Sequence, residues 1–167
     1  QLWWREVPTK ADVPGPIARQ SQPAVAQVIV ARPEGVDRGP DFERALYLAR
    51  RRIEREAGLG DPFQVVAFSS RTTVYKGMLT PDQLAAFYPD LRDPRFKSAL
   101  AMVHSRFSTN TLPQWPLAQP FRTLCHNGEI NTVLGNRTAW RAREAAFFSS
   151  AFGRRLHRIH QLPVALA

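Results

Sequence analysis

Two apolar runs that each lead into a polar motif place the strongest constraint on how this chain can fold. The first run covers residues 99–103 and leads to Arg106, and the second covers residues 121–125 and leads to Asn127 and Gly128. Short apolar runs bounded by turn residues are typical of β-strands. We therefore expect the first run to form a central strand and the second run to form its partner.

The polar motifs that follow these runs suit a site for a small substrate with a carboxylate and a reacting carbonyl. An arginine such as Arg106 can grip a carboxylate through two parallel hydrogen bonds. The Asn127 amide beside the Gly128 backbone N–H can form an oxyanion hole. Structural roles are the alternatives: Arg106 can pair with Glu129 or Asp93, and the Asn-Gly pair can be an ordinary hairpin turn with positive φ.

The rest of the chain mixes patterns typical of strands with patterns typical of helices. Over most of the proline-rich residues 1–23 we expect irregular structure, because proline removes a backbone donor and restricts its neighbour. The elements expected after it are a strand over residues 26–30, a helix over residues 41–57, a hairpin of residues 63–68 and 72–77, a short helix opened by the capping box Thr80-Pro81-Asp82-Gln83 and ended by Pro89, and a helix from Asn131 towards Phe148. Such a mixture indicates the α+β class.

The order of these motifs resembles the class II glutamine amidotransferases. Members of that class carry an Arg-aromatic-x-Thr motif on one strand, matched by residues 106–109, and an Asn-Gly turn on another, matched by residues 126–131. The linking residues 113–122 (Pro-Gln-Trp-Pro-Leu-Ala-Gln-Pro-Phe-Arg) and residues 135–137 (Gly-Asn-Arg) narrow the likeness to the glutamate synthase large subunit. An isolated Asn-Gly pair is a common turn signal, so the ordered combination carries the resemblance.

The resemblance is strongest over residues 69–144 and is lost after about residue 146. It implies a partial amidotransferase domain over residues 1–146 and a divergent tail over residues 147–167. The implied fold is the four-layer αββα sandwich of N-terminal-nucleophile hydrolases, and we expect this chain to be an internal piece of it, incomplete at both ends.

The resemblance also implies which residues act on glutamine. Arg106, Phe107 and Thr109 would close around the α-carboxylate of the substrate. Asn127 and Gly128 would donate hydrogen bonds to the oxygen that becomes negatively charged when the side-chain amide is attacked.

The nucleophile implied by the resemblance is an N-terminal cysteine whose own α-amine acts as the base. This chain begins with Gln1, and its single cysteine, Cys125, follows an apolar run, where a buried and inert thiol is the usual outcome. His104 and His126 are expected to be satisfied core histidines rather than bases. The family also uses a downstream acidic residue to hold the α-ammonium group of the substrate, and no residue of this chain matches it. We therefore expect this chain alone to be inactive.

The parent enzyme implied by the resemblance makes glutamate from glutamine and 2-oxoglutarate with FMN and an iron–sulfur cluster. We expect neither cofactor and no metal in this chain, because no spacing of His, Cys, Asp and Glu favours a metal site. Its implied partners are the remainder of the large subunit, including an FMN synthase domain, and a small NADPH-dependent subunit. The electron donor, NADPH or ferredoxin, stays open. A single cysteine fits a cytoplasmic protein, and no apolar run is long enough to predict a membrane span.

The net charge of +9 raises another kind of protein to consider, a basic module that binds nucleic acid. The basic residues are scattered, and the run at residues 50–52 is accompanied by Glu54 and Glu56. We therefore favour a solvated helix face for this run and expect no nucleic-acid partner. The other alternative is a class II amidotransferase of the type that makes purine precursors.

Overall fold

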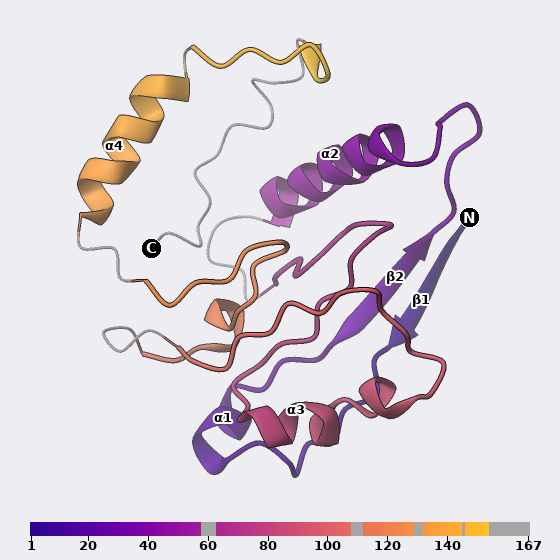
Figure 1. Cartoon of the computed structure of the whole chain (residues 1–167), viewed down its shortest axis with the longest axis vertical. Coiled ribbons are helices and arrows are strands. Elements are labelled where there is room, and N and C mark those ends of the chain that lie inside the picture. The colour runs from indigo at the N-terminus through magenta and orange to yellow at the C-terminus, as the bar shows by residue number, and fades with distance from the viewer. Residues whose placement is uncertain (58–62, 108–111, 129–131, 145, 154–167) are drawn as a thin grey trace.

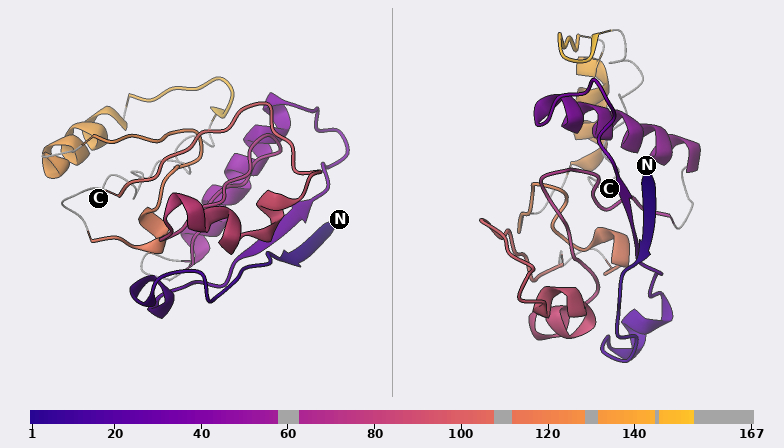
Figure 2. Two further views of the ribbon diagram at one scale, coloured as in Figure 1. Left: turned by 60° about the horizontal axis from the view of Figure 1, so that its bottom comes forward. Right: turned by 90° about the vertical axis from the view of Figure 1, so that its right-hand side faces the viewer.

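The computed structural model describes residues 1–57, 63–107, 112–128, 132–144 and 146–153 (Figure 1). In chain order the elements are β1 (Leu2–Glu6), α1 (Pro16–Gln20), β2 (Ala26–Val30), α2 (Pro40–Ala57), α3 (Pro81–Phe87), η1 (Pro89–Arg92), η2 (Trp115–Leu117) and α4 (Val133–Glu144), where η marks a 3₁₀ turn. Helices are combined with a two-stranded sheet, so the chain is α+β as expected. Figures 1 and 2 show α1 and α3 side by side at one end of the sheet and α2 at the other.

The sheet pairs β1 with β2 in antiparallel register, with Leu2 opposite Val30 and Glu6 opposite Ala26. The strand expected at residues 26–30 is therefore confirmed. The irregular structure expected over most of residues 1–23 is wrong for β1 and α1. Prolines begin only after Glu6, so the five residues of β1 keep all their backbone donors and can pair.

The helix expected over residues 41–57 is confirmed as α2, which buries Leu46 against the rest of the chain. The solvated face expected for its basic run is wrong in part. Arg50 and Arg51 both bind the Glu54 carboxylate, and their side chains are only 15% and 17% exposed. Only Arg52, which pairs with Glu56, extends into solvent.

The hairpin expected over residues 63–77 is wrong, because the structure gives this segment no strand. Its bend is tied to α2 instead: the Glu43 carboxylate accepts hydrogen bonds from the Ser69 hydroxyl (2.8 Å), the Ser70 N–H (2.7 Å) and the Ser70 hydroxyl (2.6 Å). Burial opposes ionisation of Glu43, but these bonds outweigh it and lower the pKa of the carboxyl. Bonds to the helix thus take the place of the cross-strand bonds of a hairpin.

The paired strands expected at residues 99–103 and 121–125 are also wrong. Residues 121–124 instead fold back on themselves, and Phe121 and Leu124 exchange backbone hydrogen bonds of 2.8 and 2.9 Å. Arg122 sits in this turn with φ of 53°, a value that few residues other than glycine adopt. A segment that turns so sharply cannot run extended beside a second strand.

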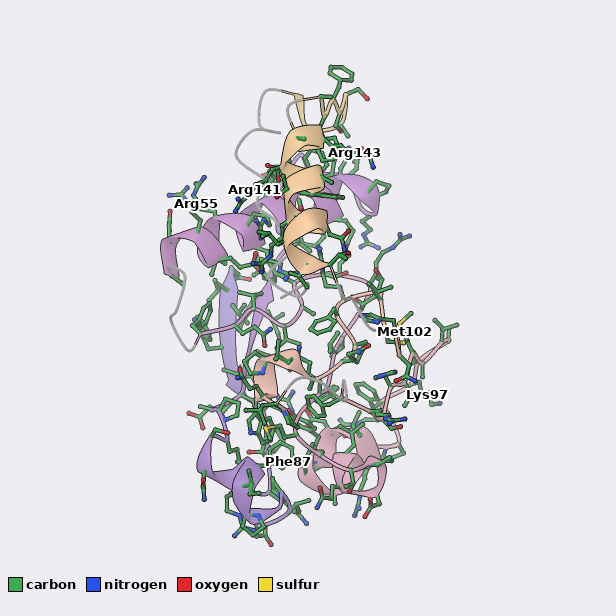
Figure 3. The ribbon with its side chains drawn as sticks, turned by 90° about the vertical axis from the view of Figure 1, so that its left-hand side faces the viewer. Arg55, Phe87, Lys97, Met102, Arg141 and Arg143 are labelled. Atoms are coloured by element: carbon green, nitrogen blue, oxygen red, sulfur yellow. The ribbon has the colours of Figure 1, made fainter. Side chains whose placement is uncertain are left out.

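The aromatic core lies between the start of the chain, α3 and η2. The capping box predicted at Thr80 opens α3, and the helix ends before Pro89 as expected. Phe87 is completely buried, and its ring meets those of Tyr88 and Trp115 at 4.6 and 5.6 Å between centroids. Figure 3 shows Phe87 surrounded by side chains near α1 and α3. Aromatic rings in such contacts dominate the burial of a small core.

A carboxylate fastens the sheet to this core. Arg5 of β1 donates to both oxygens of Asp90 at 2.6 and 2.7 Å, and the Tyr75 hydroxyl donates to the same carboxylate at 2.8 Å. The bonds from Arg5 lower the pKa of Asp90, with a smaller contribution from Tyr75. The carboxylate therefore stays ionised and joins three segments that are distant in the sequence.

The C-terminal helix predicted after Asn131 is confirmed as α4, which lies away from the β1–β2 sheet (Figures 1 and 2). Trp140 contacts Phe147 with 5.4 Å between ring centroids, whereas Leu134 is exposed. Asn131 itself lies outside the described residues. None of the helices in the described part of the chain is long and apolar enough to cross a membrane.

Candidate functional site

The segment that leads to the candidate site is anchored in the core by Trp115, the buried residue of η2. Its indole Nε1 donates to the Ala18 carbonyl at 2.9 Å, and its ring packs on Phe87. Gly77 lies directly against the ring, where a Cβ would come within 2.4 Å of it. Glycine is required at such a close approach, so the Trp115 ring of η2 packs directly against the backbone of Gly77.

The carbonyl of Pro116 provides a second anchor for the same turn. It accepts hydrogen bonds from Lys76 Nζ at 2.9 Å and Gln64 Nε2 at 3.2 Å. The Lys76 ammonium also lies 4.9 Å from the centroid of the Phe121 ring. Loss of water around the ammonium, aided by the nearby charge of Arg50, lowers the pKa of Lys76 to about 8.

The chain then makes the narrow turn that carries the candidate oxyanion residues. After the two backbone bonds between Phe121 and Leu124, the next contact across the turn is made by a side chain. Gln119 Nε2 donates to the His126 carbonyl at 2.8 Å, and the His126 N–H donates to Gln119 Oε1 at 2.7 Å. We call residues 119–128 the corner.

Asn127 and Gly128 form the exposed end of the corner. The Gly128 N–H donates to Nδ1 of His126 at 3.1 Å. Gly128 is not in the left-handed region, so the alternative of an ordinary hairpin turn with positive φ is wrong. The donor that an oxyanion would need is thus already directed at an acceptor, and the Asn127 amide beside it is open to solvent.

The expected carboxylate clamp lies on the segment that ends at residue 107. Arg106 is exposed and Phe107 is half-buried, while Thr109 lies outside the described residues. Figures 1 and 2 show that this segment and the corner lead towards the same side of the molecule. No hydrogen bond or ring contact joins Arg106 or Phe107 to Asn127 among the described residues.

The structural alternative for Arg106 is resolved in part. Asp93 is taken by Arg95, with 2.7 Å between Nη2 and Oδ2, so the alternative that pairs Arg106 with Asp93 is wrong. Glu129, the other partner considered, lies outside the described residues. The guanidinium of Arg106 is left exposed to solvent, as a group that receives a carboxylate ligand requires.

The histidines and the cysteine differ from their expected environments. His104 Nε2 is buried without a hydrogen-bond partner, so the expectation of a satisfied core histidine is wrong for His104. The backbone of His126 and its Nδ1 are hydrogen-bonded within the corner. Cys125 is a half-buried free thiol in irregular chain between Leu124 and His126, rather than at the end of a strand.

Sequence reasoning did not assign a role to Gln119 or to Lys76. Gln119 stands in a proline-rich stretch that carried the family resemblance, but nothing in that stretch indicates which backbone groups its amide contacts. Lys76 is only 8% exposed and has no carboxylate partner among the described residues. Neither its burial nor its lack of a carboxylate partner can be predicted from the residues around it in the sequence.

Comparisons with known proteins agree with the motifs. A family model described as "Glutamine amidotransferases class-II" matches residues 1–165. The glutamate synthase [NADPH] large chain of Bacillus subtilis is 48% identical over 164 residues, which cover 98% of this chain and 11% of the relative. The ferredoxin-dependent glutamate synthase 2 of Synechocystis is 51% identical over 143 residues, which cover 86% of this chain and 9% of the relative.

The chain therefore spans about a tenth of the length of the curated relatives that it matches. The expected resemblance to the glutamate synthase large subunit is confirmed at this level of identity. Because the family model matches nearly the whole chain, this chain belongs to the class II glutamine amidotransferases.

Proposed function

We propose that this chain supplies the oxyanion hole and the carboxylate clamp of the glutaminase part of a glutamate synthase large chain. The observation that carries the proposal is the corner, where the exposed Asn127 amide stands beside the Gly128 N–H on a turn fixed from behind by Gln119. Preorganised donors of this kind stabilise the charge that develops during acyl transfer.

In this proposal glutamine binds with its α-carboxylate on Arg106. The fork of N–H groups on the guanidinium matches a carboxylate, and Phe107 and Thr109 complete the wall around it. The side-chain carbonyl of glutamine then lies at Asn127 and Gly128, which donate to its oxygen as the amide is attacked. The Gly128 N–H exchanges the imidazole of His126 for the more strongly negative oxygen.

The attacking group comes from outside these residues in our proposal. Cys125 is an internal, half-buried residue held between two neighbours in the corner, and it has no α-amine to act as a base. The N-terminal cysteine implied by the family has no counterpart among residues 1–167. We therefore propose that the chain by itself hydrolyses no glutamine.

The four-layer sandwich remains a proposal for the complete domain. It is supported by apolar side chains that stay exposed on this chain and are suited to burial against further layers. They include Trp4, Leu100, Val103 and Leu134. We also propose the boundary at residue 146, with residues 147–167 as a divergent tail, most of which lies outside the described residues.

The parent reaction, from glutamine and 2-oxoglutarate to glutamate, belongs to the whole protein. FMN and an iron–sulfur cluster would supply its redox chemistry, but the residues of this chain do not fit the cluster. A cluster is held by several cysteine thiolates, and this chain has only Cys125. The described residues also bring together no group of three or more His, Cys, Asp or Glu side chains.

The proposed partners are accordingly the FMN synthase domain and the rest of the large chain, with a small NADPH-dependent subunit where NADPH is the donor. Relatives named for NADPH and for ferredoxin match this chain about equally well, so neither donor is favoured. A reducing, cytoplasmic setting is proposed from the single free cysteine.

The test places residues 1–165 into the Bacillus subtilis large chain, in exchange for the segment that they match, and measures glutamine hydrolysis. We expect the chimaera to release ammonia and the 167-residue chain alone to release none. Replacing Asn127 by Ala should lower kcat by about a hundredfold to a thousandfold, while the control Asn136→Ala on the exposed side of α4 should not.

Replacing Arg106 by Ala in the same chimaera should mainly raise KM for glutamine, because the clamp holds substrate and transition state alike. Ammonia release by the isolated chain would contradict the proposal that the nucleophile lies outside these residues. Full activity of the Asn127→Ala chimaera would contradict the oxyanion assignment itself.

A further inference from the structure

We propose that Gln119 is a positioning residue for the oxyanion corner and acts through the backbone of His126. The inference deepens the proposed function and rests on it. Gln119 makes no contact with Asn127 or Gly128 among the interactions of the described residues. Its effect on the reaction would come entirely from where it holds the chain that leads to them.

The amide of Gln119 acts as one rung of a ladder. Phe121 and Leu124 exchange two backbone bonds, and one step further from the turn the Gln119 side chain exchanges two bonds with the His126 backbone, at 2.8 and 2.7 Å. A carboxamide has both a donor and an acceptor at the spacing of a peptide group. Gln119 therefore pairs with His126 as a neighbouring strand would.

The position of the His126 backbone then decides where Asn127 and Gly128 lie, because these two residues follow it directly. The imidazole Nδ1 of His126 accepts the Gly128 N–H at 3.1 Å. Asn127 lies between these two held residues. If Gln119 releases the His126 backbone, Asn127 and Gly128, which follow it directly in the chain, lose the fixed backbone that sets their position.

Gln119 can hold the corner firmly because its own backbone is fixed to the core. It follows Ala118, which is buried and donates its N–H to the Trp115 carbonyl at 3.3 Å. Trp115 in turn is bonded to the Ala18 carbonyl and packed on Phe87. A short path of buried residues thus connects the core to the amide, as a rigid supporting group requires.

The kinetic test uses the chimaera with the Bacillus subtilis large chain and replaces Gln119 by Leu, which keeps the volume and removes both bonds. We expect kcat for glutamine hydrolysis to fall by about tenfold to a hundredfold, because displacements near 1 Å have effects of this size. KM for glutamine should change by less than about twofold, since the clamp at Arg106 is untouched. The matched control is Gln114→Leu, an exposed glutamine in the same loop.

A second variant separates positioning from general damage. Gln119→Glu keeps the acceptor for the His126 N–H but sets a carboxylate oxygen against the His126 carbonyl until the acid takes up a proton. The kcat of this variant relative to the parent should therefore rise as the pH is lowered, whereas the ratio for Gln119→Leu should stay constant. A ratio for Gln119→Glu that stays constant with pH would contradict the positioning role.

A readout that does not depend on catalysis is amide hydrogen exchange in the 167-residue chain. Gln119→Leu should accelerate exchange at His126 and Gly128, and Gln114→Leu should not. Equal exchange in the two variants, or equal kcat in the two chimaeras, overturns the positioning role and leaves the proposed function standing. An inactive parent chimaera overturns the proposed function, and the positioning role falls with it.

Discussion

The aromatic core and the corner are held in place by different forces. The core joins Val7, Phe87, Tyr88 and Trp115 through apolar contacts that exclude water. Burial of this kind is strong but non-directional, so it stabilises the fold without fixing any donor to a fraction of an ångström. It is suited to holding the chain together rather than to aiming a group.

The corner has the opposite character. Asn127 and Gly128 are exposed, and the turn behind them is fixed by directional bonds from Gln119 and within residues 121–124. Each such bond adds only about 1 kcal/mol to stability but sets a direction. Substitutions in the core should therefore act mainly on the free energy of unfolding, and those in the corner mainly on catalysis.

The largest effect that this comparison predicts is that of Phe87→Ala on stability. The ring is completely buried and touches two other rings, so its loss should lower the free energy of unfolding by about 3–5 kcal/mol. Equilibrium denaturation of the chain measures it, with the exposed Phe148→Ala as the control. A loss under about 1 kcal/mol would mean that the core is not what holds this chain together.

An intermediate effect is expected for Gly77→Ala, which adds a methyl group where the core meets η2. The new Cβ would lie 2.4 Å from one Trp115 ring atom and 3.0 Å from another. Overpacking of this kind lowers stability by about 1–3 kcal/mol. The control, Gly135→Ala in α4, has nothing within 4 Å and should be neutral or stabilising by up to about 1 kcal/mol. Equal effects of the two would contradict the close contact.

The helices could be predicted from the sequence because their signals are local. The apolar spacing of α2, the capping box of α3 and the proline after it all act within a few neighbours. The strands were predicted less well, since a strand exists only with a partner. β2 finds one in β1, whereas residues 63–68 lie beside no paired strand among the described residues.

The candidate site could be predicted as residues but not as an arrangement. Asn127 and Gly128 were identified from their motif, but the motif does not show that the Gly128 N–H donates to the imidazole of His126 two residues earlier. The role of Gln119 depends on the turn at residues 121–124, which brings a backbone seven residues away to its amide. Such contacts depend on the exact path of the turn, which the residue types in residues 119–128 do not specify.

The smallest predicted effect concerns Lys76, which lies where the core and the corner meet. Burial lowers its pKa to about 8, from 10.5 in the unfolded chain. Between these values the unfolded chain binds more protons, so this lysine makes stability rise with pH, by at most about 1.4 kcal/mol per pH unit. Lys76→Met should remove that rise, and Pro116 would keep Gln64 as a donor.

Denaturation between pH 7.5 and 9 measures the slope before the tyrosines of the unfolded chain begin to ionise at about pH 10. Burial raises the pKa of Tyr88 to about 12 and that of Tyr75 as well, so at higher pH these groups would lower stability. The exposed Lys97→Met serves as the control and should keep the slope of the parent chain. If Lys76→Met retains the slope, the ammonium is still hydrated in solution. Pro116 would then be held by Gln64 rather than by a buried charge, and the corner would rest on the core through hydrogen bonds between neutral groups alone.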